Sequence, residues 1–199
     1  PMSARRQRQM CIRDSYNLCV AMQALGRLID AEENCRRAIA LKPDYIEAYN
    51  NLGITLQGQG RLEEAEASYR EAIELKPHYA EAHYNLGITL QELGKLNEAE
   101  TSYTQTIILK PDFAEAHYNL GVTLKELGKL NKAEESYREA TVLKPDYIEA
   151  HNNLGSTLQE LGKFNEAERS YRQATVLKPD FAEAHYNLGV AFKELGRLE

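Results

Sequence analysis

The sequence lacks any apolar run near the roughly 20 residues that a membrane-spanning helix needs. Its start also lacks the succession of charged, apolar and small residues that marks a signal peptide. Cysteine is scarce, at three of 199 residues: Cys11, Cys19 and Cys35. These absences indicate a cytoplasmic chain with reduced cysteines. The content of 43% hydrophobic and 27% charged residues is that of a soluble, folded protein.

Positive charge is scarce beyond the first residues. Residues 1–15 hold four arginines against one acid, a net charge of +3, so the overall formal charge of −6 leaves −9 for the rest. An acidic body argues against the phosphate backbone of nucleic acid as a partner. We therefore predict neither nucleic acid nor a membrane as a partner.

A recognisable catalytic motif is also missing. No Ser/His/Asp or Cys/His set has a spacing that implies shared geometry, and a Leu-Gly pair inside a predicted helix is not a phosphate-binding loop. We predict that this chain itself is not an enzyme, with no catalytic residue and no cofactor.

What the sequence does contain is a strict repeat. A Lys-Pro dipeptide recurs every 34 residues, with its proline at Pro43, Pro77, Pro111, Pro145 and Pro179. A period of this length predicts a solenoid of stacked helix pairs. The units are 12–45, 46–79, 80–113, 114–147 and 148–181, followed by a partial unit, 182–199.

Small and large residues keep fixed places within each unit. A Leu-Gly pair recurs in the first half, with its glycine at Gly53, Gly87, Gly121, Gly155 and Gly189. The second half carries an alanine and then a tyrosine, at Tyr69, Tyr103, Tyr137 and Tyr171. Small residues at fixed places indicate where two helices cross closely, and large ones where the space between them is filled.

Unit 80–113 shows the expected helix boundaries. Gly94 predicts the end of the first helix. The second helix is expected from about residue 97 to 109, because Pro111 stops it. Asp112 and Glu115 then have the spacing of a capping box that starts the next helix.

These residues closely resemble the tetratricopeptide repeat, from Tyr16 to Glu199. The resemblance implies an all-α fold, a right-handed superhelical solenoid of antiparallel helix pairs whose first helices line a concave, peptide-binding groove. Cys19 and Cys35 depart from the family pattern, standing where glycine and tyrosine are expected. A second departure is histidine at the usually aromatic fourth position, at His83, His117, His151 and His185.

The histidines do not predict a metal site. Equivalent helices of neighbouring repeats pack about 8–10 Å apart, whereas ligands that share a zinc ion lie within about 4 Å of one another. We therefore expect packing roles for the histidines and no metal.

The segment RRQRQMCIRDS, residues 5–15, fits neither the repeat nor the acidic body. Read backwards into codons, it resembles a transposase sequencing adapter. We expect residues 1–15 to be a non-native or disordered leader and residues 16–199 to be the repeat array, with a genuine basic arm as the alternative. The last unit stops partway, so we also expect the native protein to continue beyond Glu199.

An asparagine occupies the sixth position of every unit, at Asn17, Asn51, Asn85, Asn119, Asn153 and Asn187. Asparagine inside a helix is unfavourable relative to alanine by up to about 0.7 kcal/mol. In the family this position faces the groove, where a side-chain amide can donate to and accept from a peptide main chain at once. The row resembles the asparagine ladder of the O-linked N-acetylglucosamine transferase superhelix. The alternative is that the amides join adjacent repeats or record recent duplication.

Charges beside this row define the expected ligand. Lys125 and Lys193 relieve a set of groove acids, which are Glu92, Glu126, Glu160 and Glu194. We predict an extended, neutral to basic peptide, bound by the asparagines with Lys125 and Lys193. The chain is then a protein–protein interaction module or, alternatively, the substrate-recruiting arm of an O-linked N-acetylglucosamine transferase whose catalytic domain lies beyond Glu199. The pattern predicts no oligomeric state.

Overall fold

Eleven α-helices and no strands make up the part of the chain that the computed structural model describes, residues 4–196. They form an all-α helical repeat solenoid, as the period predicts. The helices group into two units, residues 1–95 and 96–199.

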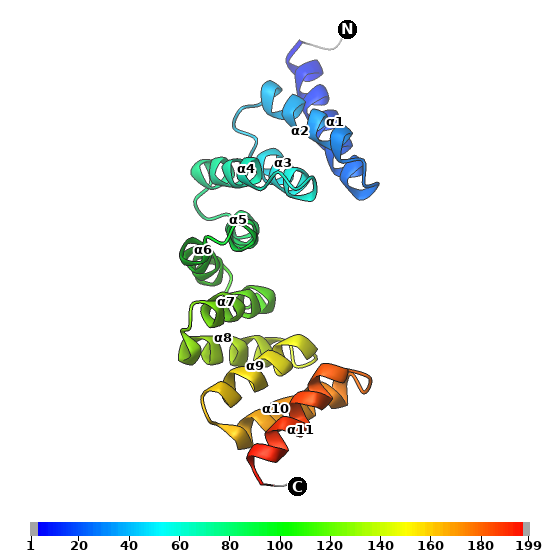
Figure 1. Cartoon of the computed structure of the whole chain (residues 1–199). Coiled ribbons are helices and arrows are strands. Elements are labelled where there is room, and N and C mark those ends of the chain that lie inside the picture. The colour runs from blue at the N-terminus through cyan, green and yellow to red at the C-terminus, as the bar shows by residue number, and fades with distance from the viewer. Residues whose placement is uncertain (1–3, 197–199) are drawn as a thin grey trace. The chain divides into compact units, whose positions relative to one another are not determined.

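Unit 1 consists of five helices. They are α1 (Ala4–Ala24), α2 (Leu28–Leu41), α3 (Ile46–Gly58), α4 (Leu62–Leu75) and α5 (Ala80–Glu92). The two helices of one repeat pack as a pair, α1 on α2 and α3 on α4 (Figure 1). Each second helix also packs on the first helix of the following repeat, α2 on α3 and α4 on α5.

Unit 2 continues the same pattern. Its helices are α6 (Leu96–Leu109), α7 (Ala114–Glu126), α8 (Leu130–Leu143), α9 (Ile148–Glu160), α10 (Phe164–Leu177) and α11 (Ala182–Glu194). The pairs are α7 with α8 and α9 with α10 (Figure 1). Helices α6, α8 and α10 pack on the first helices that follow them.

The core of three repeats, 46–79, 114–147 and 148–181, contains a contact between the first-helix glycine and the second-helix tyrosine. Tyr69, Tyr137 and Tyr171 are at most 1% exposed. A Cβ atom placed on Gly53, Gly121 or Gly155 would lie 2.5–2.7 Å from the nearest ring atom of the corresponding tyrosine. Glycine therefore allows the two helices to approach closely enough for the ring to fill the space between them.

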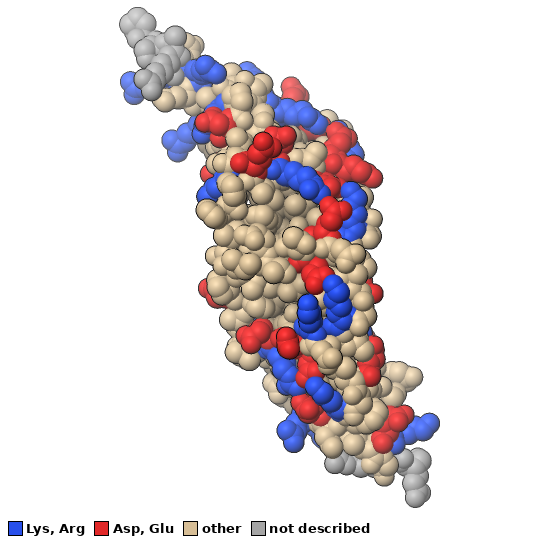
Figure 2. Space-filling view, turned by 90° about the vertical axis from the view of Figure 1, so that its left-hand side faces the viewer, with Lys and Arg blue, Asp and Glu red and all other residues tan. Residues whose placement is uncertain are grey.

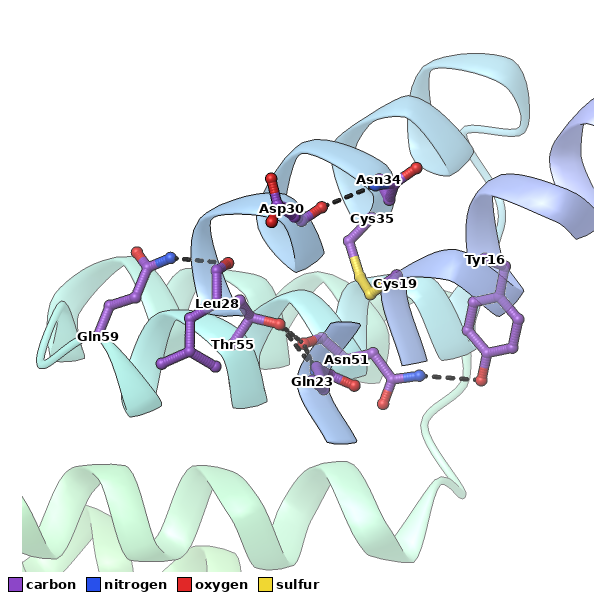
Figure 3. Close-up of a disulfide and its surroundings, with 10 residues drawn as sticks. All are labelled: Tyr16, Cys19, Gln23, Leu28, Asp30, Asn34, Cys35, Asn51, Thr55 and Gln59. Atoms are coloured by element: carbon purple, nitrogen blue, oxygen red, sulfur yellow. Dashed lines mark hydrogen bonds between the residues drawn. A yellow bond between two sulfur atoms is a disulfide. The ribbon is translucent and has the colours of Figure 1, made fainter. Parts of the chain in front are cut away.

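The first repeat replaces this glycine–tyrosine contact with a disulfide. Cys19 on α1 and Cys35 on α2 are fully buried and joined, with their Cα atoms 5.3 Å apart (Figure 3). The prediction of reduced cysteines is therefore wrong for this pair. The cause is positional, because the two cysteines occupy the glycine and tyrosine places, where the helices touch.

Helix ends largely match the sequence. The turn after each first helix contains a glycine with φ between 65° and 76°, at Gly26, Gly60, Gly94, Gly128, Gly162 and Gly196. Glycine adopts this left-handed conformation without the penalty of a Cβ atom. Each second helix ends at a leucine directly before Lys-Pro, as predicted for α6 at Leu109.

The capping box predicted at Asp112 and Glu115 is wrong. Helix α7 has Phe113 as its N-cap residue and no side-chain cap, so Asp112 lies one position too early. The same offset holds at α3, α9 and α11, whose N-cap residues are Tyr45, Tyr147 and Phe181. The backbone carbonyls of these aromatic residues accept hydrogen bonds from N–H groups of the first turn instead. Ala116 N, for example, donates to Phe113 O at 3.0 Å.

The expected leader differs in structure from a disordered arm. Residues 4–15 belong to helix α1, and Arg8 Nη2 donates to Leu41 O at 2.7 Å. Their origin as adapter sequence stays a prediction. Residues 1–3 lie outside the described range.

Ion pairs join four second helices, α2, α4, α6 and α8, to the turn of the next repeat. A glutamate of the second helix pairs with the lysine or arginine 29 residues later, giving Glu32–Arg61, Glu66–Lys95, Glu100–Lys129 and Glu134–Lys163. Acidic and basic side chains accordingly adjoin on the face drawn in Figure 2.

Candidate peptide-binding site

The candidate site is the row of asparagines on the first helices. Helices α1, α3 and α5 of unit 1 carry Asn17, Asn51 and Asn85, and helices α7, α9 and α11 of unit 2 carry Asn119, Asn153 and Asn187. Asn17 is exposed, and the other five are partly exposed. Each unit thus presents three asparagines at the same position of successive first helices.

Four of these amides donate a hydrogen bond to the preceding repeat. In unit 1, Asn51 Nδ2 donates to Tyr16 Oη at 2.9 Å (Figure 3), and Asn85 Nδ2 donates to Asn50 Oδ1 at 3.0 Å. Unit 2 repeats both contacts. Asn153 Nδ2 donates to Tyr118 Oη at 3.1 Å, and Asn187 Nδ2 donates to Asn152 Oδ1 at 3.2 Å. The alternative role foreseen for these residues, joining adjacent repeats, is therefore present in the structure.

The acceptors of these bonds were missed in the sequence. They stand at the fifth position of the 34-residue repeats, directly before the asparagine of the same repeat: Tyr16, Asn50, Tyr118 and Asn152. Burial raises the pKa of Tyr16 and Tyr118, although the asparagine bond acts in the opposite direction. A signal was available, because every fifth position carries a tyrosine or an asparagine, and both can accept a hydrogen bond.

The donated bond leaves the amide oxygen available. The Oδ1 atoms of Asn51, Asn85, Asn153 and Asn187 have no hydrogen-bond partner among the described residues. No buried side-chain nitrogen or oxygen in that part of the chain lacks a partner. These four oxygens therefore reach solvent while the neighbouring repeat holds the amide.

A second set of contacts links the ends of the first helices. Gln57 Nε2 donates to Glu92 Oε1 at 2.8 Å in unit 1. In unit 2, Lys125 Nζ lies 2.9 Å from Glu160 Oε1 and donates to Ser156 Oγ at 2.7 Å. Lys125 thus pairs with one predicted groove acid, whereas Glu92 accepts a hydrogen bond from the neutral Gln57 amide and has no ion pair among the described residues.

Lys193, Glu126 and Glu194 are the remaining charged residues predicted to line the groove. The side chains of Lys193 and Glu126 are exposed, on α11 and α7. Glu194 is also exposed. Their roles as ligand contacts stay predictions.

The four histidines make one repeated contact. In each case Nε2 lies 2.9–3.0 Å from the carbonyl oxygen of the preceding proline, six residues earlier: His83 with Pro77, His117 with Pro111, His151 with Pro145 and His185 with Pro179. The ring nitrogen must carry the proton to donate to a carbonyl. The histidines therefore hold the Lys-Pro turn against the next helix. Within residues 4–196 no group of three or more potential ligands is arranged to hold a metal ion.

Comparison with known families identifies the repeat. The profile described as "TPR repeat" matches residues 58–94, 89–128, 123–162 and 158–196, and one described as "Tetratricopeptide repeat" matches residues 34–67. The chain belongs to the tetratricopeptide-repeat family. Curated protein sequences gave no match.

Several solved structures share the fold. A structure titled for the functional characterisation of Pseudomonas aeruginosa pilF has 18% identity and a TM-score of 0.82, covering 96% of this chain and 87% of that one. MamA from Desulfovibrio magneticus RS-1 has 20% identity and a TM-score of 0.79, covering 86% and 97%. YrrB, described as a TPR protein with an unusual peptide-binding site, has 21% identity and a TM-score of 0.76, covering 86% and 89%. At these identities the likeness establishes the fold alone.

None of the helices in the described range is long and apolar enough to cross a membrane.

Proposed function

We propose that the chain is a protein–protein interaction module that holds an extended peptide segment along its first helices through the asparagine amides. One observation carries the proposal. In Asn51, Asn85, Asn153 and Asn187, one amide N–H donates to the preceding repeat, and the amide oxygen remains open to solvent.

Such an amide is preorganised for main-chain recognition. Its oxygen can accept a peptide N–H, and its second N–H can donate to a peptide carbonyl. Because the neighbouring repeat already orders the side chain, binding costs less conformational entropy than it would for a free asparagine. The two roles foreseen for the asparagines are therefore compatible.

The charges favour a neutral to basic ligand. Glu92 keeps an uncompensated charge beside Gln57, and Glu126 and Glu149 are exposed without an ion pair among the described residues. Lys125 pairs with Glu160, which agrees with its expected role of relieving the groove acids, and its contact with a ligand stays a prediction. The larger alternative, a recruiting arm of a glycosyltransferase, would use the same amides and stays a prediction.

A pair of variants separates binding from repeat joining. Asn153→Ala removes the amide oxygen, the inter-repeat bond and the interaction with the Tyr137 hydroxyl, whereas Tyr118→Phe removes only the acceptor of the inter-repeat bond. The probe is a peptide selected against the chain from a displayed random library, and its Kd is measured by calorimetry. We expect Asn153→Ala to weaken binding by about 0.5–1.5 kcal/mol and Tyr118→Phe to leave it nearly unchanged.

Thermal melting of both variants completes the experiment. A lower Tm for both variants with unchanged peptide affinity would show that the asparagines only join repeats. Equal losses of affinity would show that the peptide does not use the Asn153 amide.

A further inference from the structure

A cleft in unit 2 lies apart from the asparagine row. It measures about 430 Å³ and lies between α6, α7 and α8. Its apolar lining includes Ile107 and Ile108 of α6 and Leu120 of α7, and Ile108 is 65% exposed. Leu120 directly follows Asn119, and adjacent helical residues point about 100° apart. The cleft is therefore a different surface of α7 from the asparagine row.

Thr104 opens this cleft by replacing an arginine. All four other complete second helices have arginine at the equivalent position: Arg36, Arg70, Arg138 and Arg172. Each of these arginines pairs with the glutamate four residues before it. Thr104 instead donates its hydroxyl to the backbone oxygen of Glu100 and lines the cleft. A long cationic side chain is thus absent at this one second helix.

The opposite wall is acidic. Glu135 and Glu139 of α8 line the cleft and are exposed, and neither has an ion pair among the described residues. They are four residues apart on one helix, where like charges repel each other. A cation placed between them would relieve that repulsion.

The acidic pair occurs at this repeat alone. The positions of Glu135 and Glu139 are occupied by Arg169 and Gln173 on α10, and the position of Thr104 by Arg138 on α8. The corresponding place one repeat later is therefore basic. In an array of near-identical repeats, the threonine at position 104 and the paired glutamates at 135 and 139 therefore line the same cleft.

We propose that this cleft is a second docking site, for a basic peptide segment of a partner protein. An aliphatic side chain of the partner lies against Ile107, Ile108 and Leu120. A neighbouring lysine or arginine of the partner lies against Glu135 and Glu139, the two carboxylates that line the cleft. Charge complementarity thus selects the occupant, because the apolar floor is bordered by two uncompensated carboxylates.

The test uses two short fluorescein-labelled peptides and the full chain. The peptides share the same leucines and differ only in carrying lysine or glutamate at the remaining positions. Fluorescence anisotropy should show that the lysine peptide binds and the glutamate peptide does not. Failure of the lysine peptide to bind, or equal binding of both peptides, would overturn the proposal.

Three variants locate the binding. Thr104→Arg introduces the side chain that the other second helices carry, and should abolish most binding by occupying the cleft. The double change Glu135→Gln with Glu139→Gln should weaken binding roughly threefold to thirtyfold. The control, Glu63→Gln with Glu71→Gln, alters the net charge equally on the exposed face of α4 and should have almost no effect.

Matching losses in the cleft and control variants would mean that only overall charge attracts the peptide, which contradicts a docking site. Asn153→Ala should leave the lysine peptide bound. This result distinguishes the cleft from the asparagine row, so that either proposal can fail without the other.

Discussion

A Cβ atom on Gly121 would lie 2.7 Å from Cδ1 of Tyr137, closer than real side chains pack. Gly121 is on α7, Tyr137 is on α8, and the ring is 1% exposed. The two helices therefore meet at a distance that no larger residue permits without movement of the ring. The same relationship holds for Gly53 with Tyr69.

The first prediction follows from that contact. Gly121→Ala should destabilise the chain by about 1–3 kcal/mol, the usual cost of overpacking a core. Gly189 on α11 is the matched control, because a Cβ there meets nothing within 4 Å. Gly189→Ala should be neutral, or stabilising by up to about 1 kcal/mol, from helix propensity alone. Urea unfolding of both variants tests this, and equal stability changes would contradict the contact.

The second prediction concerns acid stability. Burial alone would raise the pKa of the Glu66 carboxyl, but hydrogen bonds from Lys95 and Arg70 outweigh burial and lower that pKa below its ordinary value of 4.5. A lowered pKa in the folded state stabilises the protein above the unfolded-state pKa, and this contribution is lost as pH falls through the folded-state pKa. Glu66→Gln should therefore cost about 1 kcal/mol at pH 7 and progressively less below pH 4.5.

Urea titrations between neutral and acid pH measure that difference. Glu71→Gln on the same helix is the control, because Glu71 is exposed and has no ion pair among the described residues. A cost of Glu66→Gln that stays constant down to acid pH would refute the electrostatic contribution.

The third prediction concerns the disulfide. Cys19 and Cys35 are 16 residues apart, and closing a loop of that length stabilises a protein by about 3 kcal/mol. Reduction should therefore destabilise the first repeat. Hydrogen exchange should quicken in α1 and α2 and change little in unit 2, because stability in a solenoid is carried by neighbouring repeats.

A matched variant restores the repeat pattern. Cys19→Gly combined with Cys35→Tyr rebuilds the pair seen at Gly53 and Tyr69, and its exchange should not respond to reductant. Finding three free thiols in the denatured, unreduced chain would show that the disulfide does not form.

The fold could be predicted from the sequence because the period and the glycine and tyrosine places are geometric requirements of helix crossing. The disulfide was missed because the redox state of Cys19 and Cys35 was predicted from the expected cytoplasmic location of the chain. Their separation equals that of Gly53 and Tyr69, which meet in space, so the contact was visible in the spacing.

The candidate site was less predictable. The position of the asparagines followed from the repeat, but the bond from Asn51 to Tyr16 depends on how one repeat is rotated against the next. The predicted capping box failed for a similar reason, since a shift of one residue removes Asp112 from the N-cap position. Spacing predicts which residues share a face, and hydrogen-bond partners require coordinates.

The ion pairs between repeats have an evolutionary consequence. In each of the four pairs, the glutamate of a second helix meets a cation 29 residues later. The contact between one repeat and the next is therefore equivalent at these four junctions. Excision of residues 114–147 would leave Glu100 to meet Lys163 in place of Lys129. Unequal recombination can therefore lengthen or shorten the gene without creating an unmatched junction. The cleft at Thr104 draws on two particular repeats, so the same excision would delete it, and selection for that cleft would preserve those two repeats while the copy number of the others drifts.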